Sequence, residues 1–440
     1  MATVPKNYAL QRLLRAADWG PAQLAQAIRR LAAEDGVALS CHHTTVRRWL
    51  NGTRPRPPYP GLLLECLSRR LGRRVSAHEA GLSNAPVIIA GPSWTADPLH
   101  RLAQLTRVEL DPNQPPSAGN GVYTLAALSS PAIDSPLAAA PRGGSFEADG
   151  TAAMGGLFAA VADRYGGRHT IVALSAHVAH EVLPRLTLPI RPQARPALLS
   201  SAARLTLLLG NMSIDSGRDA TAQQYHLIAA QLAAEAGDEA ALAISLRAMV
   251  THAYARGHHT AGVLRLAELA DRHAPLAVRA YTESQLAVIL AHHDRRAASV
   301  VLSRAERSQD RATKVGGVVG PFGSYPTSAL YFQRAQALEV MGDSEGAVSA
   351  LNTSIRLRSP AEVLPGALTR ARLAEMHFKV GNIDQAVDSW EIFVQHYPEF
   401  RSAKATNAMQ GAHRLLRSRR LHRRAAELDE RILSLLEMPS

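Results

Sequence analysis

The sequence predicts an all-α protein built from more than one domain. Its 440 residues are enough for two or three domains of roughly 150 residues each. Hydrophobic residues make up 46% of the chain but aromatic residues only 5%, so most of the apolar mass is alanine and leucine. That balance favours helices over a β-sandwich, which needs more β-branched and aromatic side chains. Helical periodicity runs through residues 7–82 and 151–437, and no segment shows the alternation typical of a sheet.

The charge divides the chain into a basic head and a nearly neutral remainder. Residues 1–86, the head, hold 13 Lys and Arg against 5 Asp and Glu, a net charge of +8. The rest of the chain carries the remaining +4 of the total +12. A small basic domain attached to a neutral body is typical of nucleic-acid-binding proteins, and a solvated basic surface is the alternative.

Within the head, a supporting helix is predicted over residues 21–32, with the apolar stripe Leu24, Ile28 and Leu31. A short helix over 43–50 follows, in which Val46 and Trp49 face inward with Leu50, and two packing helices are expected over 59–82. The outward face of the short helix carries threonine and arginine, which suits the DNA major groove because arginine can bond guanine O6 and N7. A proline-stiffened loop after it carries two arginines placed to grip phosphates. The residues predicted to contact DNA are His43, Thr44, Thr45, Arg47, Arg48, Asn51, Arg54 and Arg56.

These pieces resemble the Xre-type, or lambda-repressor-like, helix-turn-helix domain. The matching residues are Leu24–Ala25, Val46, Trp49–Gly52, Pro55 and the LSRRLG stretch at 67–72. The resemblance implies a five-helix domain over residues 1–86 that binds double-stranded DNA.

Residues 87–150 lose the helical pattern and are predicted to form a linker. Between Asp111 and Gly150 there are six Pro and five Gly, with many Ser and Ala. One short amphipathic piece, Leu99–Val108, interrupts the stretch.

Residues 151–437, the array, contain an internal repeat. Segments 248–269, 334–355 and 372–393 each show an apolar helix that ends at a glycine, a polar turn, and a second helix that opens on a small residue. A fourth copy spans 209–233 and a degenerate fifth spans 282–305. The glycines are Gly257, Gly342 and Gly381; the small residues are Gly262, Ala347 and Ala386; the large residues four positions further are Leu266, Leu351 and Trp390. The pattern resembles the tetratricopeptide repeat, which implies a degenerate superhelix of antiparallel helix pairs.

The whole chain resembles regulators of high-GC Gram-positive bacteria that join these two parts. The signatures are RWLNGTRPR (48–56), ADRYGG (162–167) and the stretch 320–343. The resemblance implies a transcriptional regulator of development or secondary metabolism. It also implies an array that forms a homodimer, takes a peptide or small-molecule effector in its groove, or both.

Other motifs predict no chemistry. The histidine pairs His177/His180, His258/His259 and His292/His293 have no acidic residue at ligand spacing, so no metal or cofactor is expected. The glycine-rich stretch 316–323 lacks the Lys-Ser/Thr of a phosphate loop. The basic run 413–424 is either an auxiliary nucleic-acid or partner surface, or the charged outer face of a capping helix. Cys41 is expected to be a buried thiol, with a redox switch as the alternative.

The cysteine count and the hydropathy indicate neither a disulfide-rich protein nor a membrane protein. Cys41 and Cys66 are too few for a disulfide scaffold, and no apolar run reaches the ~18 residues of a membrane span. The chain start is unlike a signal peptide. We therefore expect a cytoplasmic, non-enzymatic, DNA-binding regulator without membrane contact. The alternative is an adaptor or scaffold whose head and repeat groove bind proteins.

Overall fold

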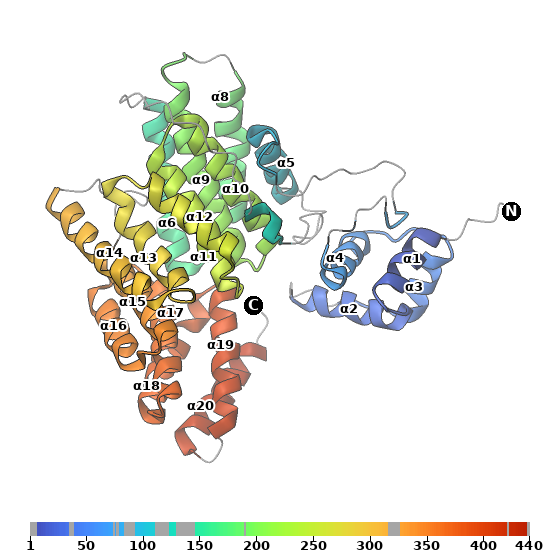
Figure 1. The fold of residues 1–440 in the computed structure, drawn as a ribbon. Helices are drawn as coiled ribbons and strands as arrows, with labels where there is room; N and C mark the ends of the chain where they lie inside the picture. The colour runs from blue at the N-terminus through green and yellow to red at the C-terminus, as the bar shows by residue number, and fades with distance from the viewer. Residues whose placement is uncertain are drawn as a thin grey trace.

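The computed structural model of the chain is all-α over the residues that it describes (Figure 1), which confirms the predicted fold class. These are residues 7–34, 39–73, 75, 79–82, 93–110, 123–128, 146–188, 191–315, 326–419 and 422–437. The glycine-rich stretch 316–323 therefore lies outside the described residues.

The head folds around a hydrophobic core of its own. Its helices are α1 (Tyr8–Ala16), α2 (Pro21–Glu34), α3 (His43–Leu50) and α4 (Tyr59–Leu71). The core includes Leu10, Leu24, Ile28, Val46, Trp49, Leu63 and Leu67, and none of its members belongs to the array. The described residues hold four helices where five were expected. A fifth would fall between 72 and 82, where 79–82 form a turn and residues 74 and 76–78 lie outside the described part.

The segment expected to be a linker contains two elements that pack on the array. They are α5 (Pro98–Leu110) and the 3-10 turn η1 (Leu125–Leu128). Leu102 and Leu105 of α5 and Leu128 of η1 are buried in the core of the array. The amphipathic piece at Leu99–Val108 thus lies within a docked helix, because its apolar stripe has a partner elsewhere in the chain. Within the expected linker, residues 87–92, 111–122 and 129–145 lie outside the described residues.

The array begins with a group of helices that precedes its regular pairs. The elements are α6 (Phe146–Tyr165), η2 (Gly167–His169), α7 (Ile171–His177), the π-helical turn η3 (Val178–Val182) and α8 (Leu183–Thr187). α6 thus starts five residues before the expected boundary at residue 151.

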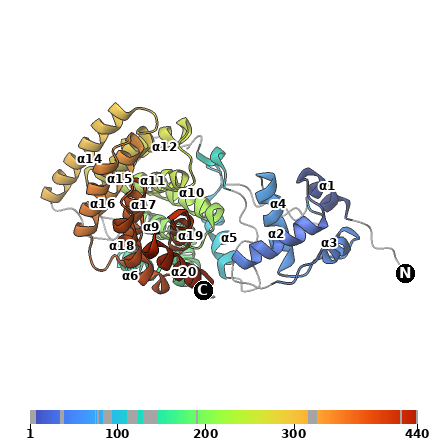
Figure 2. The same ribbon diagram turned by 90° about the horizontal axis from the view of Figure 1, so that it is seen from below.

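From α9 onward, the described helices form six antiparallel pairs that stack side by side (Figures 1 and 2). The pairs are α9 (Arg195–Asp215) with α10 (Asp219–Ala236), α11 (Glu239–Ala255) with α12 (Ala261–His273), α13 (Leu276–Leu290) with α14 (Arg295–Val315), α15 (Thr327–Met341) with α16 (Ser344–Leu357), α17 (Val363–Lys379) with α18 (Ile383–His396), and α19 (Ala403–Leu416) with α20 (Arg423–Glu437). Short 3-10 turns η4 (Tyr397–Glu399) and η5 (Arg417–Arg419) flank α19. Each of the first five pairs contains one of the five repeat segments within its longer bounds.

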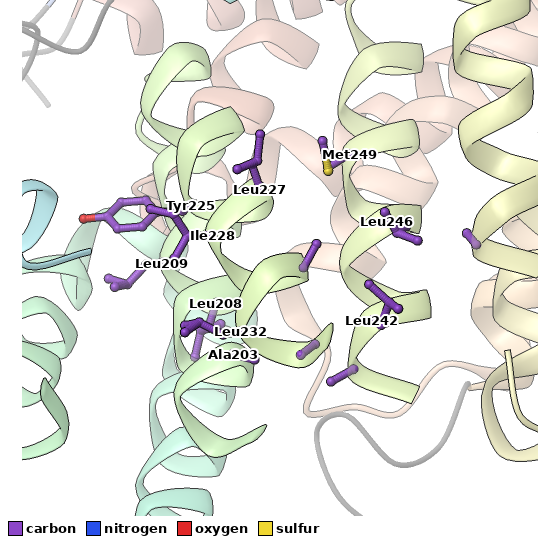
Figure 3. Close-up of a cluster of buried hydrophobic side chains, with 14 of the residues drawn as sticks. Ala203, Leu208, Leu209, Tyr225, Leu227, Ile228, Leu232, Leu242, Leu246 and Met249 are labelled. Carbon is purple, nitrogen blue, oxygen red and sulfur yellow. The ribbon is translucent and has the colours of Figure 1, made fainter. Parts of the chain in front are cut away.

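Small side chains allow the paired helices to approach closely. Ala222, Ala347 and Ala386 are fully buried at the positions that the repeat predicted to be small. Leucines and isoleucines then fill the space between neighbouring pairs, as the side chains between α9, α10 and α11 show (Figure 3). α9 is long and apolar enough to cross a membrane, and 72% of its 18-residue apolar window is buried inside the protein.

The helix α13 is fixed by four consecutive buried polar residues, Thr282–Gln285. The Thr282 hydroxyl lies 3.3 Å from the Asp271 carboxylate on α12, and the Glu283 carboxylate lies 2.7 Å from Arg304 Nε on α14. On the α11 side, Thr251 donates to the Gln285 side-chain oxygen at 2.9 Å. Because a buried polar group without its partner is costly, these bonds specify the register of three neighbouring helices.

The ADRYGG motif joins the beginning of the array to its end. The Arg401 amide donates to the Tyr165 carbonyl at 2.7 Å, and the Gly167 amide donates to the Asp215 carboxylate at 3.2 Å. Gly166 has φ +92°, and a Cβ there would lie 2.6 Å from the Arg401 carbonyl oxygen. Lys404 lies 2.9 Å from the same Asp215 carboxylate. The motif therefore connects α6 and η2 to α9 and to the segment that leads into α19.

We expect Gly166→Ala to lower the free energy of unfolding more than Gly342→Ala does. Both glycines have positive φ, which costs a residue with a Cβ about 1–2 kcal/mol. Only Gly166 adds a collision, because nothing lies within 4 Å of a Cβ at Gly342. Urea denaturation of the two variants measures the difference, and equal midpoints would contradict the close contact at Arg401.

Candidate nucleic-acid interface

The helix α3 has one buried face and one exposed face. Val46 is fully buried and Trp49 nearly so, while Thr44, Arg47 and Arg48 are exposed on the other side. The predicted bounds of this helix, 43–50, are those of the structure. Burial of the apolar side chains fixes which face of α3 points inward. The arginines therefore lie on the opposite, solvent-exposed face of the helix.

Two side chains from neighbouring helices hold the segment that enters α3. An Arg29 guanidinium nitrogen on α2 donates to the carbonyl of Cys41, and the Tyr59 hydroxyl on α4 donates to the carbonyl of Ser40 at 2.9 Å. The Tyr59 ring also packs against Trp49, with 5.4 Å between ring centroids. The start of α3 is thereby fixed against both adjacent helices.

Asn7 fixes the other end of α3. Its amide N–H donates to the Leu50 carbonyl at 2.9 Å, and its side-chain oxygen caps α1 at the Leu10 amide. Its side-chain nitrogen donates to the Ala80 carbonyl at 2.8 Å. One residue thus connects α1, the end of α3 and the 79–82 turn.

The charges of the head are separated between two of its sides. Arg69 on α4 bonds both Glu34 and Glu65, at 2.7 and 2.8 Å, and Arg73 bonds Glu79 at 2.6 Å. In the described part of the head, no carboxylate pairs with Arg47, Arg48 or Arg56. Three of the five acidic residues of the head are therefore paired on the α4 side, and the positive charge of Arg47, Arg48 and Arg56 remains available to an anion.

The structure places the predicted DNA-contacting residues on one continuous segment from α3 into the loop that follows it. All are exposed except Thr45, which is half-buried and donates its amide to the His42 carbonyl at 2.9 Å. The exposed residues are His43, Thr44, Arg47, Arg48, Asn51, Arg54 and Arg56.

Three residues that orient this segment were missed by the sequence analysis. Asn7 was detectable, because an Asn directly before an apolar periodic run is a helix-cap signal. Arg29 and Tyr59 gave no local signal, since their contacts are with backbone carbonyls 12 and 19 residues away in the chain.

The other sequence motifs take structural roles in the described residues. No group of His, Cys, Asp or Glu there could hold a metal ion. His259 and His292 stack on each other, with ring centroids 4.1 Å apart, across two neighbouring turns. In the basic run 413–424, Arg424 bonds Asp388 and Glu391 on α18, and His413 bonds Asp429. These contacts favour the capping-helix interpretation of the basic run.

Comparison with known proteins gives one result for the head. A family model described as the SP15 N-terminal domain matches residues 10–83. No curated protein is similar to the chain. The family match ends before the array, so it concerns the head alone.

We expect Trp49→Ala to destabilise the head by about 3–5 kcal/mol and to leave the array unchanged. Trp49 lies in the core of the head, which shares no member with the core of the array. Hydrogen–deuterium exchange resolved by peptide measures both parts of the full chain. Tyr8→Ala is the control, because Tyr8 is 64% exposed. Faster exchange throughout the array of the Trp49 variant would contradict independent cores.

The two thiols of the head are expected to be inert in the native protein at pH 8. Burial raises the pKa of the Cys41 thiol, and burial raises the pKa of Cys66 to about 12. Since the thiolate is the reactive form, both thiols should react with a disulfide reagent only after unfolding in urea. A Cys41 that reacts rapidly in the folded chain would restore the redox-switch interpretation.

Proposed function

We propose that this protein is a DNA-binding transcriptional regulator whose head is a helix-turn-helix domain of the Xre type. The observation that carries the proposal is α3: its apolar face is buried, and its exposed face presents Arg47 and Arg48 without carboxylate partners in the described head. A match to an N-terminal domain family over residues 10–83 agrees with a discrete head.

The dimensions of α3 suit the major groove. A helix with its side chains is about 10–12 Å across, which is close to the ~12 Å width of the groove, and the eight residues of α3 form about two turns. From this position, Arg47 and Arg48 would bond guanine edges, and Thr44 would contact a base or a phosphate. Arg54 and Arg56 lie in the loop after α3, where they would contact phosphates and fix the register.

In this proposal the array supplies dimerisation, effector binding, or both. Its stacked antiparallel pairs, with alanine at the close contacts, support the assignment to tetratricopeptide-like repeats. A homodimer would place two α3 helices about 34 Å apart on a pseudo-palindromic site. A peptide or small molecule that binds one conformation of the array better would change that separation.

Replacing Arg47 or Arg48 with Ala should weaken binding to the selected DNA site by about 5- to 150-fold, the equivalent of roughly 1–3 kcal/mol. Arg54→Ala and Arg56→Ala should weaken binding to all sequences and reduce the salt dependence, because they remove phosphate contacts. Arg73→Ala is the matched control, since it removes the same charge on the α4 side. Titration of a selected duplex and of a scrambled duplex, at several salt concentrations, measures each effect.

The site for these titrations comes from selection of genomic fragments by the full chain at ~150 mM salt, with the Arg47→Ala/Arg48→Ala double variant in parallel. Enrichment of a common sequence by the native chain alone is expected. Recovery of the same unenriched fragments by both chains would overturn the proposal and favour the adaptor, whose partners would then depend on the array.

A further inference from the structure

Residues 123–128, which we name the strap, are held on α10 by a contact that does not depend on their sequence. The side chain of Gln223 accepts from the Thr124 amide at 3.0 Å and donates to the Thr124 carbonyl at 2.6 Å. The glutamine amide thereby presents one donor and one acceptor to the strap backbone, as the edge of a β-sheet does to an added strand. Any residue other than proline at the Thr124 position could make this pair of bonds through its own backbone.

The end of the strap is held by two apolar side chains. Ala127 and Leu128 are 4% and 3% exposed, and both lie in the core of the array. The Trp94 indole N–H donates to the Ala127 carbonyl at 3.0 Å. Between the two contact points, Leu125 is 38% exposed and Ala126 is also exposed. The pattern of the strap is therefore an aromatic residue at 123, three residues that separate the contacts, a small residue at 127 and leucine at 128.

The aromatic residue, Tyr123, lies against α11 and the turn after it. Its ring centroid is 4.9 Å from the edge-on ring of His252 and 6.0 Å from the stacked ring of His258. The Arg256 guanidinium lies 5.3 Å from the same centroid. Asp219 on α10 bonds both His252, at 2.8 Å, and Arg256. The walls of this aromatic position are thus fixed by the array itself.

The strap is an imperfect occupant of this position. The Tyr123 hydroxyl is buried and has no hydrogen-bond partner among the residues that the structure describes, and burial raises the pKa of that phenol. A buried hydroxyl without a partner weakens binding by about tenfold or more relative to a side chain that lacks it. Phenylalanine has the same ring without the hydroxyl. The site therefore matches a phenylalanine better than it matches the tyrosine of its own chain.

From these contacts we propose that α10, α11 and α12 form a peptide-binding site that the strap occupies as an internal ligand. The external ligand is a peptide with Phe, then three residues, then a small residue and Leu, which takes the same 3-10 turn that the strap forms over Leu125–Leu128. The strap competes with it at the effective concentration of a tethered segment, on the order of millimolar. On either side of the strap, residues 111–122 and 129–145 are rich in Pro, Gly, Ser and Ala, a composition typical of linkers.

The test uses fluorescence polarisation with a labelled ten-residue peptide of the sequence 121–130, in its native form and with Phe or Ala in place of Tyr123. The Phe peptide should bind the full chain about tenfold more tightly than the Tyr peptide. Tyr123→Phe in the chain should have the opposite effect and weaken binding of every peptide about tenfold, because the strap becomes the better competitor.

A peptide with Ser in place of Ala126 is the matched control and should bind like its parent, because Ala126 is exposed. Equal affinity for the Phe and Ala peptides would overturn the proposal. Peptide affinities that are the same for the native chain and for its Tyr123→Phe variant would also overturn the proposal.

Hydrogen exchange of the unmodified chain gives a second test that no variant can confound. Saturating Phe peptide should accelerate exchange of the Thr124 amide at least tenfold and leave the amides of α5 unchanged. Unaltered Thr124 exchange at peptide saturation would overturn the proposal. This inference rests on the effector binding proposed for the array. Neither measurement involves DNA, so its failure is distinguishable from a failure of the function proposed for the head.

Discussion

The close approach of helices across small side chains is the constraint on which the array depends. A chain that is rich in alanine and has few aromatic residues buries little apolar area per side chain, so its helices must pack at short distances to exclude water. Gly210 shows how close this approach is, because a Cβ there would collide with the ring of His226 on α10. The fully buried Ala222, Ala347 and Ala386 show the same constraint in three different pairs.

This close packing also explains why so many buried polar groups are bonded between helices. His226 is fully buried against Gly210, and burial holds the pKa of its imidazole well below the usual range, so the ring is neutral and bonds Asn211 at 3.3 Å. His252, which lies edge-on to His226 with 5.9 Å between centroids, bonds Asp219. These residues first align α10 with α11, and they then form the surface that Tyr123 contacts. The aromatic position in the proposed peptide site is therefore a consequence of how the helices stack.

Helices that depend on local periodicity can be predicted from the sequence. Contacts between residues that are far apart in the chain cannot. The bounds of α3 are correct because Val46, Trp49 and Gly52 define its inner face and its end within a few residues. The repeat segments are correct for the same reason. α5 was placed in a linker because its partners are far away: Arg101 bonds Gln224 at 3.2 Å, and Glu109 bonds Arg218. ADRYGG was recognised as a signature but not explained, since its contact with Arg401 lies more than 200 residues later in the chain.

The docking of α5 decides how strongly the array can influence the head. If all of residues 87–150 were a free linker, its extended length of roughly 200 Å would make the position of the array irrelevant to DNA spacing. Because α5 is fixed through the largely buried Arg218–Glu109 pair, and Trp94 through the Gln231 amide, the chain between head and array shortens to residues 83–92. Ten residues span at most about 35 Å, close to the ~34 Å between half-sites one turn apart. In the proposed dimer, a shift of the array by a fraction of that distance would therefore change which half-site spacing two heads can reach together.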